Sequence, residues 1–385
     1  MGVLDGVKVI EVAGIGPGPF AAMMLADMGA DVLRIDRPAG GRGLSLGNAS
    51  KDVLARGRRS VALDLKSSEG LEVLLELVEG ADVLLEGYRP GVAERLGFGP
   101  DVCHGRNERL VYGRMTGWGQ DGPNAARAGH DLTYLSTAGV VAHIEGPDGA
   151  PGIPINLVGD FGGGGMLLVV GVLGALVERA ASGRGQVVDA AIVDGAALQM
   201  AMVYGMRAGG MWPNPRGGNI LDGGAPFYEH YRCRDGGWVA VGALEPQFYA
   251  ELMAGLGLEG EDIATHQWDM ARWPEFRARL AEVFATRTRD EWAADLEPTD
   301  AVVAAVLDMD EAAEHPHNKA RGLHIDAFGV RQPAPAPRFS RTPSATPTPP
   351  ASPGEHSAEA LAGWGLDPDR IARLREAGVV HQAEA

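Results

Sequence analysis

One histidine and one aspartate stand out in this sequence because glycines lie beside both. His130 follows Gly129, and Asp160 precedes a run of four glycines from Gly162 to Gly165. An imidazole and a carboxylate can each carry a proton, and glycines let a ligand approach the backbone closely. The stretch therefore predicts a proton-transfer site on a rigid scaffold.

Each of these residues also has a purely structural interpretation. His130 fits a helix cap or a core histidine, and Asp160 fits the N-cap of an apolar helix that we expect over residues 166–177. An aspartate at a helix start would also feel the helix dipole. Asn156, one turn before Asp160 if the segment is helical, is placed to orient either group. Spacing alone leaves both interpretations open.

Composition excludes several classes of function. The chain has 385 residues and a formal net charge of −17, so a general nucleic-acid surface, which needs a basic stripe, is not expected. Cys103 and Cys233 are the only cysteines, which is typical of a reducing cytoplasm and predicts no disulfide framework. No metal-ligand spacing such as HExxH occurs, so we predict no metal. The start of the chain does not have a signal-peptide pattern, and the apolar segment 166–177 is too short to span a bilayer. We therefore predict a cytoplasmic protein with no membrane partner.

The first half of the chain alternates strand and helix patterns. Strands are expected at residues 7–12, 30–36, 60–65, 81–86, 110–115 and 186–193. Repeated β-α-β order predicts a doubly wound parallel sheet, in which ligands gather at the carboxyl ends of the strands. Arg37, Lys66 and Arg89 all follow such ends.

The first β-α-β unit suggests a dinucleotide site, with Asp36 on the ribose. Its turn has glycines at 14, 16 and 18, but Pro19 stands where the third glycine of the fingerprint belongs. Pro17 and Pro19 also remove two backbone amides that a pyrophosphate would need. The turn is better interpreted as a tight strand–helix junction, and an NAD site is disfavoured.

Arg56, Arg58 and Arg59 form a local basic cluster in an acidic chain. With Arg37 and Arg95 they could bind phosphates. A solvated face balanced by acidic neighbours explains them equally well, so both interpretations stay open.

The chain divides into a large and a small domain. We expect residues 1–200 to form the large domain, completed by 325–385, with a linker at 201–220. A hairpin pattern at 227–242 and helical segments beyond it predict a smaller α+β domain over 221–318. Residues 333–353 are dense in proline and should form an extended surface strap. An amphipathic pattern in the tail predicts a short helix pair.

Several motifs in a fixed order match a known family. They lie at residues 14–19, 33–38, 86–91, 115–120, 128–131, 158–164, 221–226 and 245–249, within a likeness that runs from about residue 3 to 341. Together they resemble the α-methylacyl-CoA racemase branch of the family III CoA-transferases. The resemblance implies a Rossmann-like large domain with a smaller inserted domain. It also implies an interlocked homodimer, with each active site between the large domain of one subunit and the small domain of the other.

The resemblance implies residue roles as well. His130 and Asp160 would be the proton-transfer pair, Glu245 would support the histidine, and Asn156 would be an accessory polar group. The residues that would line the CoA and acyl site are Arg37, Leu63, Asp64, Leu65, Lys66, Gly87, Tyr88, Arg89, Arg95, Gly129, Asp131, Leu132, Thr133 and Tyr134. Acyl-CoA would be the substrate, and no cofactor beyond it would be needed.

The implied reaction inverts the carbon α to a 2-methylacyl-CoA thioester through an enolate. It needs a base on one face of that carbon and an acid on the other. The ordinary pKa values of about 6.5 for histidine and about 3.9 for aspartate make neither a strong base, so the site must stabilise the enolate. The helix start at Gly162–Gly165 is our hypothesis for that field. The main alternative is a CoA-transferase that uses Asp160 as a nucleophile, and His130 favours the racemase because a transferase needs no second proton carrier.

Overall fold

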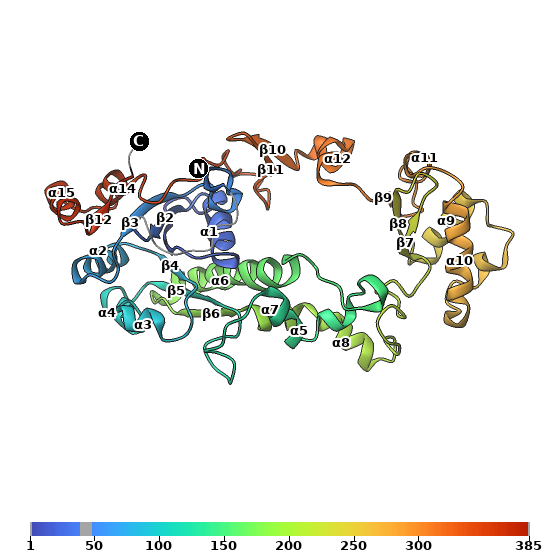
Figure 1. Cartoon of the computed structure of the whole chain (residues 1–385), viewed down its shortest axis with the longest axis horizontal. Helices are drawn as coiled ribbons and strands as arrows, with labels where there is room; N and C mark the ends of the chain where they lie inside the picture. Colours follow the sequence, from blue (N-terminus) through green and yellow to red (C-terminus); the bar gives the residue numbers. More distant parts are fainter. Residues whose placement is uncertain (1, 39–47, 384–385) are drawn as a thin grey trace. The chain divides into compact units, whose positions relative to one another are not determined.

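The computed structural model describes residues 2–38 and 48–383 and divides into two compact units. The first unit contains the chain up to Ala138, Ile155–Gln199 and the chain from Arg321 onward. The second unit contains Gly139–Pro154 and Met200–Ala320. Figure 1 shows the elements of both units coloured along the sequence.

The first unit is built on a seven-stranded sheet of order β12-β3-β2-β1-β4-β5-β6. Neighbouring strands pair in parallel, except that β12 pairs antiparallel with β3. The strands are β1 (Lys8–Val12), β2 (Asp31–Asp36), β3 (Arg59–Leu63), β4 (Val83–Glu86), β5 (Val111–Thr116), β6 (Val187–Ala191) and β12 (Val380–His381). The order reverses between β1 and β4, which is where ligands bind in doubly wound sheets. The predicted α/β fold is confirmed.

Alternating side chains bury both faces of this sheet. Ile10 and Val12 join one core with residues of α2, α14 and α15, whereas Val9 joins another with residues of α1 and α6. Strands covered on both faces read as nearly continuous apolar runs, as in β4. The helices of this unit are α1 (Pro17–Asp27), α2 (Ser68–Glu79), α3 (Val92–Leu96), α4 (Pro100–Arg106), α5 (Asp131–Thr137), α6 (Leu167–Ser182), α7 (Ile192–Gln199), α14 (Ser357–Gly363) and α15 (Pro368–Glu376), with short 3-10 turns at Ala49–Lys51 and Val53–Ala55.

The apolar helix expected over residues 166–177 is longer than the sequence suggested. A π-helical segment, η5 (Leu157–Met166), continues directly into α6. The four glycines therefore lie inside the helix, and the prediction that they form its start is wrong. A Cβ at Gly163 would lie 2.8 Å from the Ala196 nitrogen, and one at Gly165 would lie 2.7 Å from Phe20 Cδ1. The glycines let the helix pack closely on α7 and α1.

The helix from Leu157 to Ser182 has 26 residues, which by length and composition is enough to cross a membrane. The prediction that the apolar segment 166–177 is too short to span a bilayer underestimated the length of this helix. Core helices of soluble proteins pass the same test. Here Leu168, Val169 and Val172 of α6 are buried in one of the two cores of the sheet.

The end of the chain returns to the edge of this sheet. A two-stranded ribbon, β10 (His324–Ala327) and β11 (Val330–Pro333), precedes residues 334–356, which contain no helix or strand. Arg34 in β2 donates a hydrogen bond of 2.9 Å to the carbonyl of Ala351 in this extended segment. Figure 1 shows β12, α14 and α15 in red beside the blue β3 and α2.

The second unit contains a small antiparallel sheet of order β7-β8-β9. Its hairpin pairs Arg232 with Trp238, close to where the sequence predicted the turn. The strands are β7 (Tyr228–Arg232), β8 (Trp238–Gly242) and β9 (Val303–Ala305), and the helices are α8 (Ala201–Ala208), α9 (Pro246–Leu256), α10 (Trp273–Phe284), α11 (Arg289–Leu296), α12 (Met309–Glu314) and α13 (Pro316–Arg321), with 3-10 turns at Val141–His143, Pro147–Gly149, Asp262–Thr265 and Met270–Arg272. Residues of the hairpin, α9, α10 and α11 form its core.

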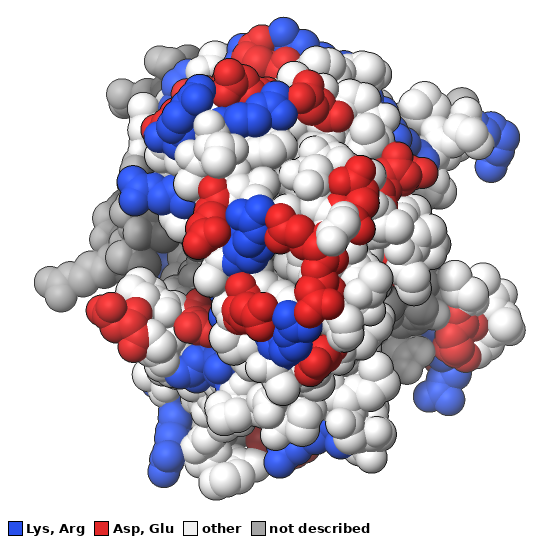
Figure 2. Space-filling model, turned by 90° about the vertical axis from the view of Figure 1, so that its right-hand side faces the viewer, with Lys and Arg blue, Asp and Glu red and all other residues white. Residues whose placement is uncertain are grey.

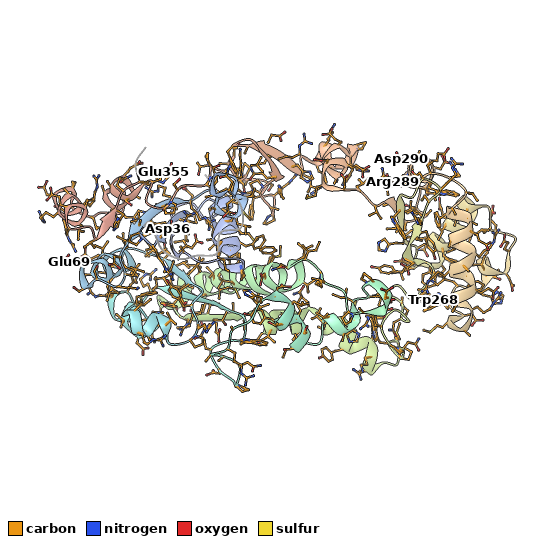
Figure 3. The ribbon with its side chains drawn as sticks, viewed as in Figure 1. Asp36, Glu69, Trp268, Arg289, Asp290 and Glu355 are labelled. Carbon is orange, nitrogen blue, oxygen red and sulfur yellow. The ribbon has the colours of Figure 1, made fainter. Side chains whose placement is uncertain are left out.

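Charges of both signs mix on the face of the molecule shown in Figure 2. The second unit contains several arginine–carboxylate pairs. Arg289, labelled with Asp290 in Figure 3, pairs with that residue at 2.9 Å and with Glu311 at 2.7 Å. The negative total charge is thus accompanied by local ion pairing.

The division into units differs in detail from the one expected from sequence. Residues 139–154, expected in the large domain, lie with the second unit, and so do residues 201–220, expected as a linker. Arg216 explains this grouping because its guanidinium donates hydrogen bonds to the carbonyls of Ala142 and Gly149. His143 also makes an edge contact with Trp212.

Candidate active site

Asp160 lies beside the turn that follows β1. A Cβ built on Gly16 in that turn would be 3.4 Å from Asp160 Oδ2. Asp160 itself belongs to η5, whose close packing on α1 and α7 brings the carboxylate to this position. The aspartate is therefore held at the carboxyl end of β1, next to the point where the strand order reverses.

Two polar neighbours contact Asp160 directly. Asn156 Nδ2 donates a hydrogen bond of 2.8 Å to Asp160 Oδ2. The backbone nitrogen of Asp160 donates one of 2.7 Å to Asp131 Oδ1. Asn156 and Ile155 both have left-handed backbones, with φ of 59° and 54°. A left-handed backbone is an outlier for a β-branched residue such as Ile155. The two left-handed residues form the turn that brings the Asn156 side chain to the Asp160 carboxylate.

The surroundings shift the proton affinity of Asp160. Burial raises its pKa above the ordinary aspartate value, opposed by the hydrogen bond from Asn156. The nearby negative charge of Asp131 raises the pKa further, and His130 lowers it. The net result is a raised pKa, which makes the carboxyl a better proton donor near neutral pH than an exposed aspartate.

His130 is the N-cap residue of α5 and has an extended backbone with φ of −139°. Thr133 holds that backbone from both sides. Its hydroxyl accepts a 3.0 Å hydrogen bond from the His130 nitrogen and donates one of 2.7 Å to the His130 carbonyl. The imidazole is exposed and acts on the Asp160 carboxyl electrostatically. The structure thus brings together the two residues that the sequence analysis singled out.

Tyr134 closes one side of this pair. Its ring packs edge-on against Trp118, with the centroids 4.7 Å apart, and a Cβ at Gly129 would lie 2.4 Å from the ring. Burial raises the pKa of the Tyr134 hydroxyl, as does the charge of Asp160, while Arg89 opposes both. Arg89 follows β4 and Trp118 follows β5, so residues beyond the carboxyl ends of two neighbouring strands act on Tyr134.

The basic residues expected to meet CoA follow the carboxyl ends of parallel strands. Arg37 comes directly after β2, Lys66 comes three residues after β3, and Arg89 comes three residues after β4, and all are exposed. Arg95 is exposed on α3, with Nη1 3.3 Å from a Cβ built on Gly91. These four cations are open to a ligand.

The other predicted CoA contacts differ in their exposure. Gly87, Leu132 and Thr133 are exposed, and Asp64, Leu65, Tyr88 and Gly129 are partly buried. The Leu63 and Asp131 side chains are buried, at 1% and 4% exposure. Leu63 therefore packs in the core, and the Asp131 carboxylate contacts the protein interior.

Glu245 belongs to a different unit from the other predicted catalytic residues and Asn156. Glu245 is the exposed N-cap residue of α9 in the second unit. Its predicted support of His130, which belongs to the first unit, stays a prediction.

Two of the three arginines of the cluster, Arg56 and Arg58, are not available to a phosphate. Arg56 and Arg58 are each 2% exposed and pair with acidic residues of the first unit. Arg56 Nη2 lies 2.6 Å from Asp27 Oδ2, and Arg58 Nη1 lies 2.7 Å from Glu11 Oε2. Both interpretations of the sequence, a phosphate site and a solvated face, are wrong for these two arginines, because both side chains are buried. A buried guanidinium needs a charged partner, and Asp27 and Glu11 provide it.

Asp36 is also engaged within the protein. Its Oδ2 accepts hydrogen bonds from Arg34 Nε at 2.7 Å and Ser60 Oγ at 2.5 Å. Figure 3 labels this residue at the end of β2. Asp36 thus has partners within the protein at Oδ2, and the argument against a dinucleotide site still rests on Pro17 and Pro19.

Three further residues contribute to this site; the sequence analysis included them in its motifs but gave them no role. Gly16, Gly159 and Trp118 each lie against one of the functional side chains or its support. Gly159 directly precedes Asp160, which was the available signal. Among the described residues, no group of three or more His, Cys, Asp or Glu side chains is placed to hold a metal ion.

Comparison with known proteins gives consistent matches along the chain. Residues 4–357 match CoA-transferase family III. Alpha-methylacyl-CoA racemase from Mus musculus is 46% identical over 381 residues, covering 98% of this chain and 97% of that protein. The Homo sapiens protein of the same name is 42% identical over 380 residues, with coverage of 98% and 97%. The crystal structure of Rv3272 from Mycobacterium tuberculosis has a TM-score of 0.79 at 28% identity, covering 93% of this chain and 99% of that one.

Proposed function

Because the chain belongs to CoA-transferase family III, we propose that it is an α-methylacyl-CoA racemase, which inverts the α-carbon of 2-methylacyl-CoA thioesters. The observation that carries the proposal is geometric: His130 caps α5, and the amide of Asp160 is bound by Asp131, the first residue of that helix. A two-base inversion needs two proton carriers that act on the same carbon from opposite faces.

The pair can share one mobile proton in two ways. When His130 is neutral and Asp160 is protonated, the imidazole takes the α-proton and the carboxyl returns one from the other face. When the imidazole is protonated and the carboxylate is ionised, the roles exchange for the other enantiomer. The raised pKa of Asp160 brings these two forms closer in free energy, which suits a reaction that runs in both directions.

The enolate must be stabilised by a group other than Gly162–Gly165. These four glycines lie inside η5, and Gly163, Gly164 and Gly165 are buried against residues of α1 and α7. Our hypothesis that they present a helix start to the enolate is therefore wrong. No metal or redox group is required by the proposed reaction, because it only exchanges protons.

The alternative function is CoA transfer with Asp160 as the nucleophile, as the name of the family suggests. A transferase would form a mixed anhydride on this carboxylate, and the group would then have to be ionised. Burial and the neighbouring Asp131 charge both raise its pKa and so disfavour the ionised form. His130 beside it adds a second proton carrier, which acyl transfer does not need.

Deuterium uptake separates the two functions. We expect the protein, incubated with one enantiomer of a 2-methylacyl-CoA in D₂O, to place deuterium at the α-carbon and to form the other enantiomer. Mass spectrometry follows the label, and chiral chromatography follows the inversion. If no label enters, and a free carboxylate added as acceptor becomes thioesterified instead, the protein is a transferase.

We also propose that the protein acts as a homodimer. Met166, Val170 and Val177 are 48%, 66% and 75% exposed on one side of the continuous helix from Leu157 to Ser182, opposite the buried Leu168 and Val172. A helix with apolar residues on both sides is expected to bury the second side against a partner. A second copy of the chain is the partner we commit to, and sedimentation that returns a monomer mass would refute it.

A further inference from the structure

Asp131 has an environment that ligand binding does not explain. It directly follows His130, yet its side chain is 4% exposed. Oδ1 accepts the hydrogen bond from the Asp160 nitrogen at 2.7 Å, and Oδ2 is buried without a hydrogen-bond partner among the described residues. A carboxylate in the first turn of an ordinary surface helix would face solvent and the helix's own amides. This one faces the neighbouring helix instead.

Gly159 is what makes this contact possible. A Cβ at this position would lie 2.1 Å from Asp131 Oδ1 and 2.9 Å from Asp131 Cγ. Gly159 is not among the glycines with a positive φ, so its backbone does not demand a glycine. The close approach of the carboxylate is therefore the reason for a glycine here.

The contact joins the two segments that carry the proton-transfer pair. His130 caps α5, and Thr133 fixes its backbone from within that helix. Asp160 belongs to η5, and its amide is bound by the first residue of α5. We propose that Asp131 is a positioning residue that sets the distance between His130 and Asp160 by tying the two helices together. This inference rests on the proposed function, because it concerns the alignment of that same pair.

The charge of Asp131 supports this assignment. The groups that act on the Asp160 carboxyl are Asn156, Asp131 and His130, together with burial, and Asp131 raises its pKa. Removing the Asp131 charge should therefore lower the pKa of Asp160. At low pH both members of the pair are protonated and no base remains, so the acid limb of the exchange profile follows this pKa.

Three variants of the full-length protein test the proposal. Asp131→Asn keeps an oxygen that can accept the Asp160 amide but removes the charge. Asp131→Ala removes the acceptor, and Gly159→Ala pushes the intact carboxylate away. Gly105→Ala is the matched control, because Gly105 is also helical and a Cβ there meets nothing within 4 Å. For each protein, deuterium uptake by a 2-methylacyl-CoA in D₂O is measured against pH, and CoA affinity is measured by calorimetry.

We expect Asp131→Ala and Gly159→Ala each to lower the exchange rate by about 10²-fold, the typical cost of a misplacement of about 1 Å. Their CoA affinity should stay near that of the wild type, whereas their melting temperatures should fall, because Asp131→Ala leaves a buried amide unpaired and Gly159→Ala crowds the contact. Asp131→Asn should lose less activity, and its acid limb should move to lower pH. The acid limb reports the charge of Asp131, whereas the exchange rate per folded molecule reports its positioning of the pair.

The result that overturns the inference is specific. If wild type exchanges deuterium, and Asp131→Asn and Gly159→Ala do so at its rate with an unmoved acid limb, Asp131 does not position the pair and the racemase proposal stands. If wild type does not exchange deuterium at all, the proposed function itself fails. Should Asp131→Ala not fold, the other two variants still decide the question.

Discussion

The first unit holds two kinds of buried or partly buried carboxylate, and they differ in their partners. Glu11 and Asp27 each pair with an arginine, at 2.7 Å and 2.6 Å. Asp131 and Asp160 contact amide groups instead, one from the backbone and one from Asn156. Among the described residues, no arginine or lysine forms an ion pair with either of them.

This difference separates stability from chemistry. A buried ion pair holds its members in one charge state, because losing either partner leaves an isolated charge. A carboxyl bound only by neutral donors can gain or lose a proton at lower cost, as a general acid–base group must. Arg56 and Arg58 therefore stabilise the fold, and Asp160, which has no arginine partner among the described residues, is the candidate for moving protons.

The largest effect is expected when a member of the proton-transfer pair is removed. His130→Ala and Asp160→Ala should each lower deuterium exchange by about 10²–10⁴-fold, the usual range for a lost general acid or base. Both side chains are exposed or partly buried and form no ion pair in the described structure, so the free energy of unfolding should change little. Exchange and denaturant unfolding measured on the same preparations check both statements.

CoA binding provides the control for these two variants. Arg37, Lys66 and Arg89 are left in place, so we expect CoA affinity to stay close to that of the wild type. Exchange at the wild-type rate in both variants would remove His130 and Asp160 from the site. Loss of exchange together with loss of folding would show instead that they are structural, like Asp27.

Arg56→Met should produce the opposite pattern. It leaves Asp27 buried without its cation and should lower the free energy of unfolding by about 3–5 kcal/mol, while exchange per folded molecule stays unchanged. Burial already raises the pKa of Asp27, and Arg56 lowers it. Without Arg56 the folded-state pKa rises further, so the destabilisation is fully present above that pKa and is relieved as the pH falls below it.

A double variant sharpens this test. Arg56→Met with Asp27→Leu removes both charges and should recover most of the lost stability. Urea unfolding followed by circular dichroism measures both proteins. An unchanged midpoint in the single variant would mean that this pair does not stabilise the fold.

Much of the fold follows from local pattern. The strands, the tight turn before α1 and the hairpin of the second unit all lie close to where apolar periodicity and turn residues placed them. The extent of the helix from Leu157 to Ser182 does not follow from local pattern, because four consecutive glycines normally argue against a helix. Packing on α1 and α7 overrides that preference.

The site was harder to predict because its contacts are long-range. The arginine cluster looked accessible in sequence, yet Arg56 reaches Asp27, 29 residues away, and Arg58 reaches Glu11, 47 residues away. Local spacing could not reveal either partner. His130 and Asp160 were identified by their neighbours and by the family resemblance, but the link between them through Asp131 appears only in the folded structure.

The smallest and most specific effect concerns Asn156. Its Nδ2 donates to Asp160 Oδ2 and lowers the pKa of that carboxyl, so removing the amide should raise the pKa and move the acid limb of deuterium exchange to higher pH. Asn156→Gly is the suitable change, because glycine accepts the φ of 59° without strain. Asn156→Asp should move the limb further in the same direction, since it adds a negative charge beside Asp160. Asp131→Asn is expected to shift the limb the other way. Opposite shifts from the two neighbours would show that Asp160 sets the acid limb, whereas shifts of the same sign would assign it to another group.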